Sequence, residues 1–175
     1  NDRSVDITNN SSLMPSQVKN LEVSNNIMSF LRFDIPSSIT DSHKIKLNLV
    51  LDGDSTLDGG ISFHKYDQTG WGESPNSKNI GIIDHSLGAT LATLTPLDNG
   101  TIVWDNGTAV SLDNGTILSV DLTDKITSYG EEYSIAIRAL GTTDKVKFFS
   151  KEKQLTDGVG GFAPQMSVWP NISFK

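Results

Sequence analysis

The sequence has no cysteine among its 175 residues. Disulfide bonds, thiolate nucleophiles and cysteine metal ligands are therefore excluded. No apolar run approaches the ~20 residues that a membrane-spanning helix needs, so we expect no membrane insertion. Basic residues are outnumbered by acidic ones, which gives a formal net charge of -7. This balance argues against a general nucleic-acid-binding protein, which would carry a basic excess.

Signatures of catalysis are also missing. His43, His64 and His85 lie in separate segments without the spacing of a zinc site. The sequence shows no nucleophile elbow of the G-x-S-x-G type and no phosphate-binding glycine loop. None of its carboxylate pairs is singled out by spacing as an acid–base set. We therefore expect a protein that is not an enzyme.

Helical periodicity is almost absent, since only Leu122–Tyr129 (LTDKITSY) reads as a helical turn or two. Elsewhere, short segments rich in Val, Ile, Thr and Phe alternate with Gly, Asn, Asp and Pro, as in all-β proteins. The predicted strands are Val18–Val23, Ile27–Ile35, Lys44–Leu51, Ile61–Tyr66, Thr90–Thr95, Gly115–Asp121, Tyr133–Leu140, Asp144–Lys153 and Gln165–Trp169. The pattern predicts a two-sheet antiparallel β-sandwich of jelly-roll type, with residues 1–175 as one domain.

The tetrapeptide Asp-Asn-Gly-Thr occurs three times, starting at Asp98, Asp105 and Asp113. Asn-Gly steps suit two-residue hairpin turns, and the segments between the copies can form short strands. Calcium-binding β-helix repeats keep a fixed period, whereas these copies are spaced unevenly. Hairpin turns are the favoured interpretation, with calcium binding and glycan attachment at Asn-Gly-Thr as the open alternatives.

Basic residues gather on the polar faces of four alternating strands. Side chains alternate between the faces of a strand, so each of these strands is expected to have one buried and one wet face. The wet faces carry Arg32, Lys44, Lys46, Arg138, Lys145, Lys147, Lys151 and Lys153. The candidate ligand-binding residues are Arg32, Lys46, Arg138, Lys147 and Lys151, with Phe30 and Phe149 as exposed rings for a sugar. If the strands share a sheet, the cations converge into a patch suited to carboxylate or sulfate groups.

Two further groups of residues have alternative interpretations. Asp52, Asp54 and Asp58 lie in a glycine-rich segment and are candidate ligands for a structural Ca²⁺, or else solvated turn residues. Among the tryptophans, we expect Trp71 to anchor a loop in the core or to serve as a ligand platform. Trp104 is expected to be exposed between its two turns, and Trp169 to be buried.

Several segments, in order along the chain, resemble the DNRLRE-type domain family. SFLRFDIPSSI (Ser29–Ile39) is similar to the family's SYLKFDLSSIP block, and LGATLATLT (Leu87–Thr95) to its LGATLASVT block. Ile61–Ser74, Ile117–Ile126 and Val146–Val168 are similar to further blocks of the family. Arg32, Asp34, Glu73, Lys151 and Glu152 match family motif positions, with Lys151 standing where the family usually has Arg.

The resemblance implies an extracellular β-sandwich, of a kind found attached to polysaccharide lyases, including alginate lyases, and in surface proteins. It therefore implies a secreted or cell-surface protein that binds an acidic polysaccharide such as alginate, tethered to a catalytic or surface domain. The alternative is a structural or adhesive module of a cell-surface protein. No cofactor is implied beyond the structural Ca²⁺ considered above.

Overall fold

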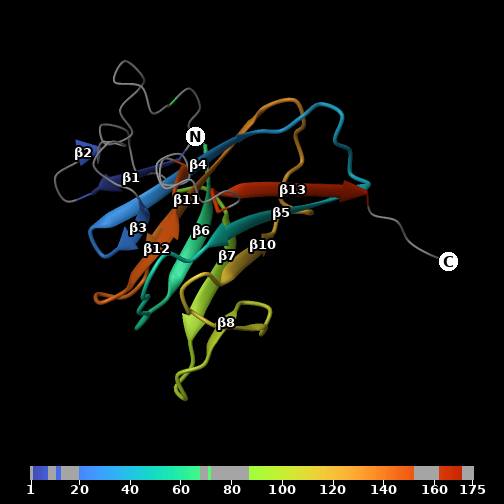
Figure 1. Ribbon diagram of the computed structural model, residues 1–175. Helices are drawn as coiled ribbons and strands as arrows, with labels where there is room; N and C mark the ends of the chain where they lie inside the picture. Colours follow the sequence, from blue (N-terminus) through green and yellow to red (C-terminus); the bar gives the residue numbers. More distant parts are fainter. Residues whose placement is uncertain are drawn as a thin grey trace.

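The computed structural model describes residues 2–7, 11–12, 20–67, 71, 87–151 and 162–170 (Figure 1). These residues form strands and connecting turns, with no helical element among them. The strands are β1 (Asp2–Asp6), β2 (Ser11–Ser12), β3 (Asn20–Ser24), β4 (Ile27–Asp34), β5 (His43–Val50), β6 (Ile61–Tyr66), β7 (Thr90–Pro96), β8 (Ile102–Trp104), β9 (Ala109–Val110), β10 (Ile117–Asp121), β11 (Glu132–Ala139), β12 (Lys145–Phe149) and β13 (Gln165–Pro170). Each of the nine predicted strands has a counterpart here, but residues 18–19 and 152–153 of two predictions lie outside the described residues, and β12 ends at Phe149.

The strands form two antiparallel sheets. The large sheet has the order β12-β3-β4-β11-β6-β7-β8-β9, with β1 paired to β4 and β2 to β1; the small sheet has the order β10-β5-β13. The predicted all-β, two-sheet sandwich is therefore confirmed. Jelly-roll connectivity stays a prediction.

The main core lies between the two sheets. Ile45, Leu47 and Leu49 of β5 are at most 1% exposed and join one hydrophobic cluster with Leu31 and Ile135 of the large sheet. Lys44, Lys46 and Asn48 alternate with them and are directed to the other side of the small sheet, as the period of two requires. The apolar set of β5 therefore fixes which of its polar side chains face outward.

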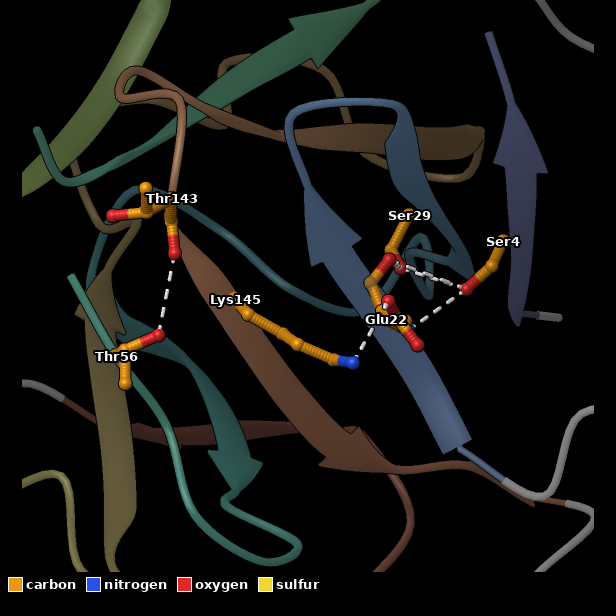
Figure 2. Close-up of polar contacts among 6 residues, drawn as sticks. All are labelled: Ser4, Glu22, Ser29, Thr56, Thr143 and Lys145. Carbon is orange, nitrogen blue, oxygen red and sulfur yellow. Dashed lines mark hydrogen bonds and ion pairs between the residues drawn. The ribbon is translucent and has the colours of Figure 1, made fainter. Parts of the chain in front are cut away.

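The β3–β12 pair joins the two sheets. β3 pairs with β4 only where their hairpin closes, at Ser24 and Ile27. Further along, the Ser29 hydroxyl donates to the Glu22 carbonyl at 2.7 Å, and the Ser4 hydroxyl lies 3.0 Å from that of Ser29 (Figure 2). These serine contacts replace main-chain pairing where β3 leaves β4.

The other strand of this pair, β12, meets the chain that follows β5. Leu51 forms an isolated bridge with Phe148, and Thr56 forms one with Lys145. Figure 2 shows Thr56 donating to the Thr143 carbonyl beside this contact, and the Lys145 ammonium directed at Glu22. Strand β12 thus connects the large sheet to the segment that leaves the small one.

A second, smaller core lies on the outer face of the large sheet. Phe30 and Tyr66 are 0% and 2% exposed, their rings 4.9 Å apart, and Trp71 covers them with 0% exposure. Val5, Met28 and Ala136 complete this cluster. The expectation of one wet face per alternating strand is therefore wrong for β4 and β11, because Trp71 and β1 bury the second face as well.

Asp144 fixes the turns at one end of the large sheet. Its side chain is buried, and its Oδ1 accepts the main-chain N–H groups of Asp58, Gly59 and Gly60 at 2.6, 3.0 and 3.3 Å. Its Oδ2 accepts those of Leu140 and Gly141 at 3.2 and 2.5 Å. Burial alone would raise the pKa of Asp144, but the hydrogen bonds outweigh burial and lower it, so the carboxylate stays ionised.

The first two Asp-Asn-Gly-Thr copies are hairpin turns, as favoured from the sequence. The Leu97 N–H donates to the Thr101 carbonyl at 2.8 Å, and the Trp104 N–H to that of Thr108 at 2.9 Å. Gly100 and Gly107 have φ of 82° and 84°, which a glycine adopts without strain. The loops have three residues and not the expected two, because a tight turn is followed by a left-handed glycine.

The segment expected to be helical, Leu122–Tyr129, makes a single turn. The Ile126 N–H donates to the Leu122 carbonyl at 3.1 Å, and the Asp121 carboxylate caps the turn through the Thr123 N–H. Within the described part of the chain, no helix has the length and apolar character to cross a membrane.

Candidate functional site

The outer face of the small sheet is an open polar surface built by the registers of its three strands. Strand β5 contributes Lys44, Lys46 and Asn48 to this face. Directly opposite residues of antiparallel strands share a face, and Lys46 stands opposite Asp121 of β10 and Ser167 of β13. This surface is called the small-sheet face below, and consists of Lys44, Lys46, Asn48, Ser119, Asp121, Ser167 and Trp169.

A short hydrogen-bond chain crosses the three strands of this face. The Ser119 hydroxyl donates to Asn48 Oδ1 at 2.7 Å, and Asn48 Nδ2 donates to the Ser167 hydroxyl at 2.8 Å. Both donor–acceptor pairs have ordinary hydrogen-bond lengths. The central asparagine thereby holds the side chains of both neighbouring strands in a fixed arrangement.

Trp169 supplies an exposed aromatic ring to the small-sheet face. It is 38% exposed, and the Lys46 ammonium lies 5.7 Å from its ring centroid, within the range of a cation–π contact. The expectation that Trp169 is buried is wrong, because its register opposite Lys44 turns the indole away from the core. A cation and an aromatic ring thus lie side by side at the surface.

Asp121 is the one carboxylate in the small-sheet face. Burial alone would raise its pKa, but hydrogen bonds from Thr123 and the positive charges of Lys46 and Lys44 lower it overall. The carboxylate therefore stays ionised and partly offsets the two lysines.

A groove adjoins this face and is lined by residues of edge strand β10 and of the β8–β9 hairpin, among others. It encloses about 400 Å³. Lys46, Ser119 and Asp121 form its wall on the sheet side, so the groove and the small-sheet face are continuous. The second Asp-Asn-Gly-Thr turn contributes Asp105, Asn106 and Thr108 to the lining, and the buried Trp104 also lines the groove.

The structure distributes the predicted cationic residues over several surfaces. Arg32 and Arg138 are on neighbouring strands and on the outer face of the large sheet, because Arg32 pairs with Ser134. Lys46 lies on the small-sheet face. Lys147 stands opposite Glu22 in the register of β12 and β3, and the exposed Lys151 lies two residues beyond the end of β12. The expected convergence of all five is therefore not found, because Lys46 lies on the small sheet, whereas Arg32, Arg138 and Lys147 lie on strands of the large sheet.

Arg32 is held by the protein itself. Its guanidinium donates to the Trp71 carbonyl, lies 5.5 Å from the centroid of the Trp71 ring and is 3.5 Å from the Glu132 carboxylate. Its side chain is 18% exposed. These contacts identify Arg32 as a residue that fastens Trp71 over the outer core.

The aromatic residues also differ from expectation. Phe30 is fully buried beneath Trp71 and does not provide an exposed ring, because the outer face of β4 is covered. Phe149 is half-buried, with its ring 5.0 Å from that of Phe162. Trp104 was expected at the surface but is 7% exposed, because it packs against Phe63 in the main core. Trp71 takes the first of its two expected roles and anchors the core.

The proposed calcium ligands do not form a cluster. Asp58 Oδ2 accepts the Thr143 N–H at 3.3 Å, which directs this carboxylate toward the turn that Asp144 organises. Within the described ranges, no group of three or more His, Asp or Glu side chains is arranged to hold a metal ion. Calcium binding at Asp52, Asp54 and Asp58 stays a prediction.

Sequence reasoning missed most of the small-sheet face. The signal was present in Gln165–Trp169 (QMSVW), where Gln165, Ser167 and Trp169 alternate with Met166 and Val168. The polar parity places Trp169 with the wet residues of β13. Alternation also places Asn48 and Ser119 on the outward sets of their strands, but it does not predict the hydrogen bond between them, because that depends on which strands are neighbours.

No protein-family model matches the chain, and no curated protein matches it. The resemblance to the DNRLRE-type family therefore stays an expectation carried by the motifs quoted above. Of its motif residues, Arg32, Asp34 and Lys151 lie within the described ranges, and Glu73 and Glu152 lie outside them.

Proposed function

We propose that this chain is a non-catalytic carbohydrate-binding module that recognises an acidic polysaccharide, such as alginate, through the small-sheet face. The observation that carries the proposal is the exposed Trp169 ring with the Lys46 ammonium 5.7 Å from its centroid. Lys44 stands directly opposite Trp169 in the strand register. A sugar acid offers the matching pair of groups, an apolar ring face and a carboxylate.

The surroundings of this pair support binding along an extended chain. The three strands form a continuous face, and the Ser119–Asn48–Ser167 chain supplies hydroxyl and amide groups beside the lysines. The two lysines and Asp121 leave a small positive excess in a protein whose overall net charge is -7. Such an excess gives weak, salt-sensitive attraction to a polyanion.

Weak binding of this kind becomes effective through tethering. A module linked to an enzyme or a surface protein holds its partner near the polysaccharide and raises the local concentration of binding sites. The proposal therefore includes a secreted or cell-surface setting and a covalently linked catalytic or surface domain.

The test is calorimetry of the full chain against alginate, with a neutral β-glucan as control, at low and high salt. We expect binding to alginate that weakens with salt, and no binding to the glucan. Replacing both Lys44 and Lys46 by alanine should weaken alginate binding at least about tenfold, which is the effect of losing ~1.4 kcal/mol.

The matched control replaces Lys145 and Lys147 by alanine, which removes the same charge from the outer side of β12. This variant should keep nearly the affinity of the original chain. Equal losses in both double variants would show attraction by overall charge and contradict a specific site. No binding to alginate in any condition would favour the structural or adhesive module instead.

A further inference from the structure

The groove beside β10 differs in chemistry from the small-sheet face that it adjoins. Among the residues that line it, Trp104 and Leu91 are apolar and buried, whereas Asn106 and Ser119 are polar and exposed. A sugar ring has the same division, with apolar C–H faces and hydroxyl groups around its edge. The volume of about 400 Å³ is at the small end of the ~300–1,000 Å³ usual for ligand sites, which suits one or two sugar units.

The charges of the groove oppose an anionic occupant. The hairpin contributes Asp105 and β10 contributes Asp121, while Lys46 is the single cation among the described residues of the lining. A uronate carboxylate would meet two carboxylates and one ammonium, and like charges at close range are unfavourable. Uncharged hydroxyl groups, in contrast, can donate to both carboxylates and accept from the lysine.

We propose that this groove is a second sugar subsite, and that it takes an uncharged unit of the same chain whose acidic unit lies on the small-sheet face. The preferred ligand is then a heteropolysaccharide that contains acidic and neutral units, and not a pure polyuronate. This inference rests on the proposed polysaccharide binding, because Lys46 belongs to both surfaces and links one subsite to the other.

The repeated turns provide a matched pair of positions for the test. Thr108 ends the second Asp-Asn-Gly-Thr turn and lines the groove, whereas Thr101 ends the first turn and does not. Both residues are exposed, and each accepts a main-chain hydrogen bond that closes its hairpin. Thr108→Trp should therefore fill the groove, and Thr101→Trp places the same bulk in an equivalent turn outside it.

Calorimetry of the full chain against alginate and four mixed polymers (hyaluronan, unsulfated chondroitin, gellan and xanthan) provides the test. We expect at least one mixed polymer to bind more tightly than alginate. Thr108→Trp should weaken that binding about tenfold or more while leaving alginate within about twofold, where tenfold corresponds to ~1.4 kcal/mol. Thr101→Trp should change neither affinity.

The possible failures are distinguishable. If alginate binds at least as tightly as every mixed polymer, or if Thr108→Trp leaves all affinities unchanged, the groove subsite is wrong and the proposed function stands. If Thr108→Trp weakens alginate as much as the mixed polymers, the groove does not select uncharged units. If no polyanion binds at all, both proposals fall.

Discussion

The outer faces of the two sheets differ in what lies over them. On the large sheet, Trp71 covers Phe30 and Tyr66, and all three side chains are at most 2% exposed. On the small sheet, Trp169 is 38% exposed and nothing among the described residues covers it as Trp71 covers Phe30. Alternation in a strand therefore predicts which residues share a face, while contacts from distant segments decide whether that face meets solvent.

A cation lies near a tryptophan ring on both faces, but this contact has different consequences on each. Arg32 lies 5.5 Å from the Trp71 ring centroid, and Lys46 lies 5.7 Å from that of Trp169. Arg32 also bonds the Trp71 carbonyl and pairs with Glu132, so its charge is used within the protein. Lys46 sits beside an exposed ring, where its ammonium can serve a ligand. We infer that the first pair stabilises the fold and the second binds.

The largest effect is expected when the cover of the large sheet is removed. Trp71→Ala should lower the free energy of unfolding by roughly 3–5 kcal/mol, the usual cost of deleting a buried aromatic side chain. Urea unfolding measures the change, and Trp169→Ala is the control, with an expected loss below ~1 kcal/mol because its ring is partly exposed. Similar losses of unfolding free energy in both variants would contradict the difference between a covered large-sheet face and an open small-sheet face.

The second-largest effect is expected at Asp144, which belongs to neither face. Asp144→Asn should lower the free energy of unfolding by roughly 2–4 kcal/mol, because its amide nitrogen cannot accept the N–H groups of Leu140 and Gly141. Asp58→Asn alters a side chain that accepts one long main-chain hydrogen bond and contacts the Asp144 carboxylate, and it should cost less than Asp144→Asn. Neither substitution should change the affinity for alginate, because neither residue lies on the small-sheet face.

The effect of Asp144 should depend on pH. Its folded pKa is lowered, so the carboxylate contributes stability that is fully present above the unfolded pKa of ~3.9 and is lost as pH falls through the folded pKa. The difference in stability between the original chain and Asp144→Asn should therefore shrink below about pH 4. A difference that stays constant down to low pH would contradict this assignment.

Crossed substitutions of the two cations sharpen the comparison further. Arg32→Ala should cost about 1–2 kcal/mol of stability, because the Trp71 carbonyl and ring lose their partner. Lys46→Ala should leave stability within ~0.5 kcal/mol and weaken alginate binding instead. Urea unfolding measures the stability of both variants, and calorimetry measures their affinity for alginate. An Arg32→Ala protein with normal stability and weakened binding would contradict a structural role for Arg32.

The smallest expected effect concerns the exposed ring. Trp169→Ala should weaken alginate binding roughly three- to tenfold, in line with ~0.5–1.5 kcal/mol for an aromatic contact. Trp169→Phe should restore part of that affinity, because a smaller ring remains. An unchanged affinity in Trp169→Ala would separate the tryptophan from the binding site.

Much of the fold was predictable because the alternation of apolar and polar residues identifies strands in the sequence. Ile45, Leu47 and Leu49 identified the buried face of β5, and Gly100 and Gly107 marked the hairpin turns. The small strands β1 and β2 were not predicted, since their segments lack clear alternation. The structural role of Asp144 was also hidden, because its five donors come from two turns distant in sequence from one another.

The candidate site was less predictable than the fold. Lys46 was correctly placed on a wet face, but the sequence does not state that its neighbours are Asp121 and Ser167. Arg32 carried the same alternation signal as Lys46 and proved to be a structural residue. Sheet order and long-range cover decide these roles, and both depend on contacts between segments far apart in the chain.

The most direct test of a binding site on the small-sheet face uses the indole N–H groups of the three tryptophans. In a ¹⁵N-edited spectrum titrated with alginate oligosaccharides, the Trp169 signal should move progressively, while the buried Trp71 signal stays fixed. Trp169→Phe assigns the signal, and high salt should reverse the shift. A Trp169 signal that stays fixed while alginate binds would contradict the small-sheet face as the site.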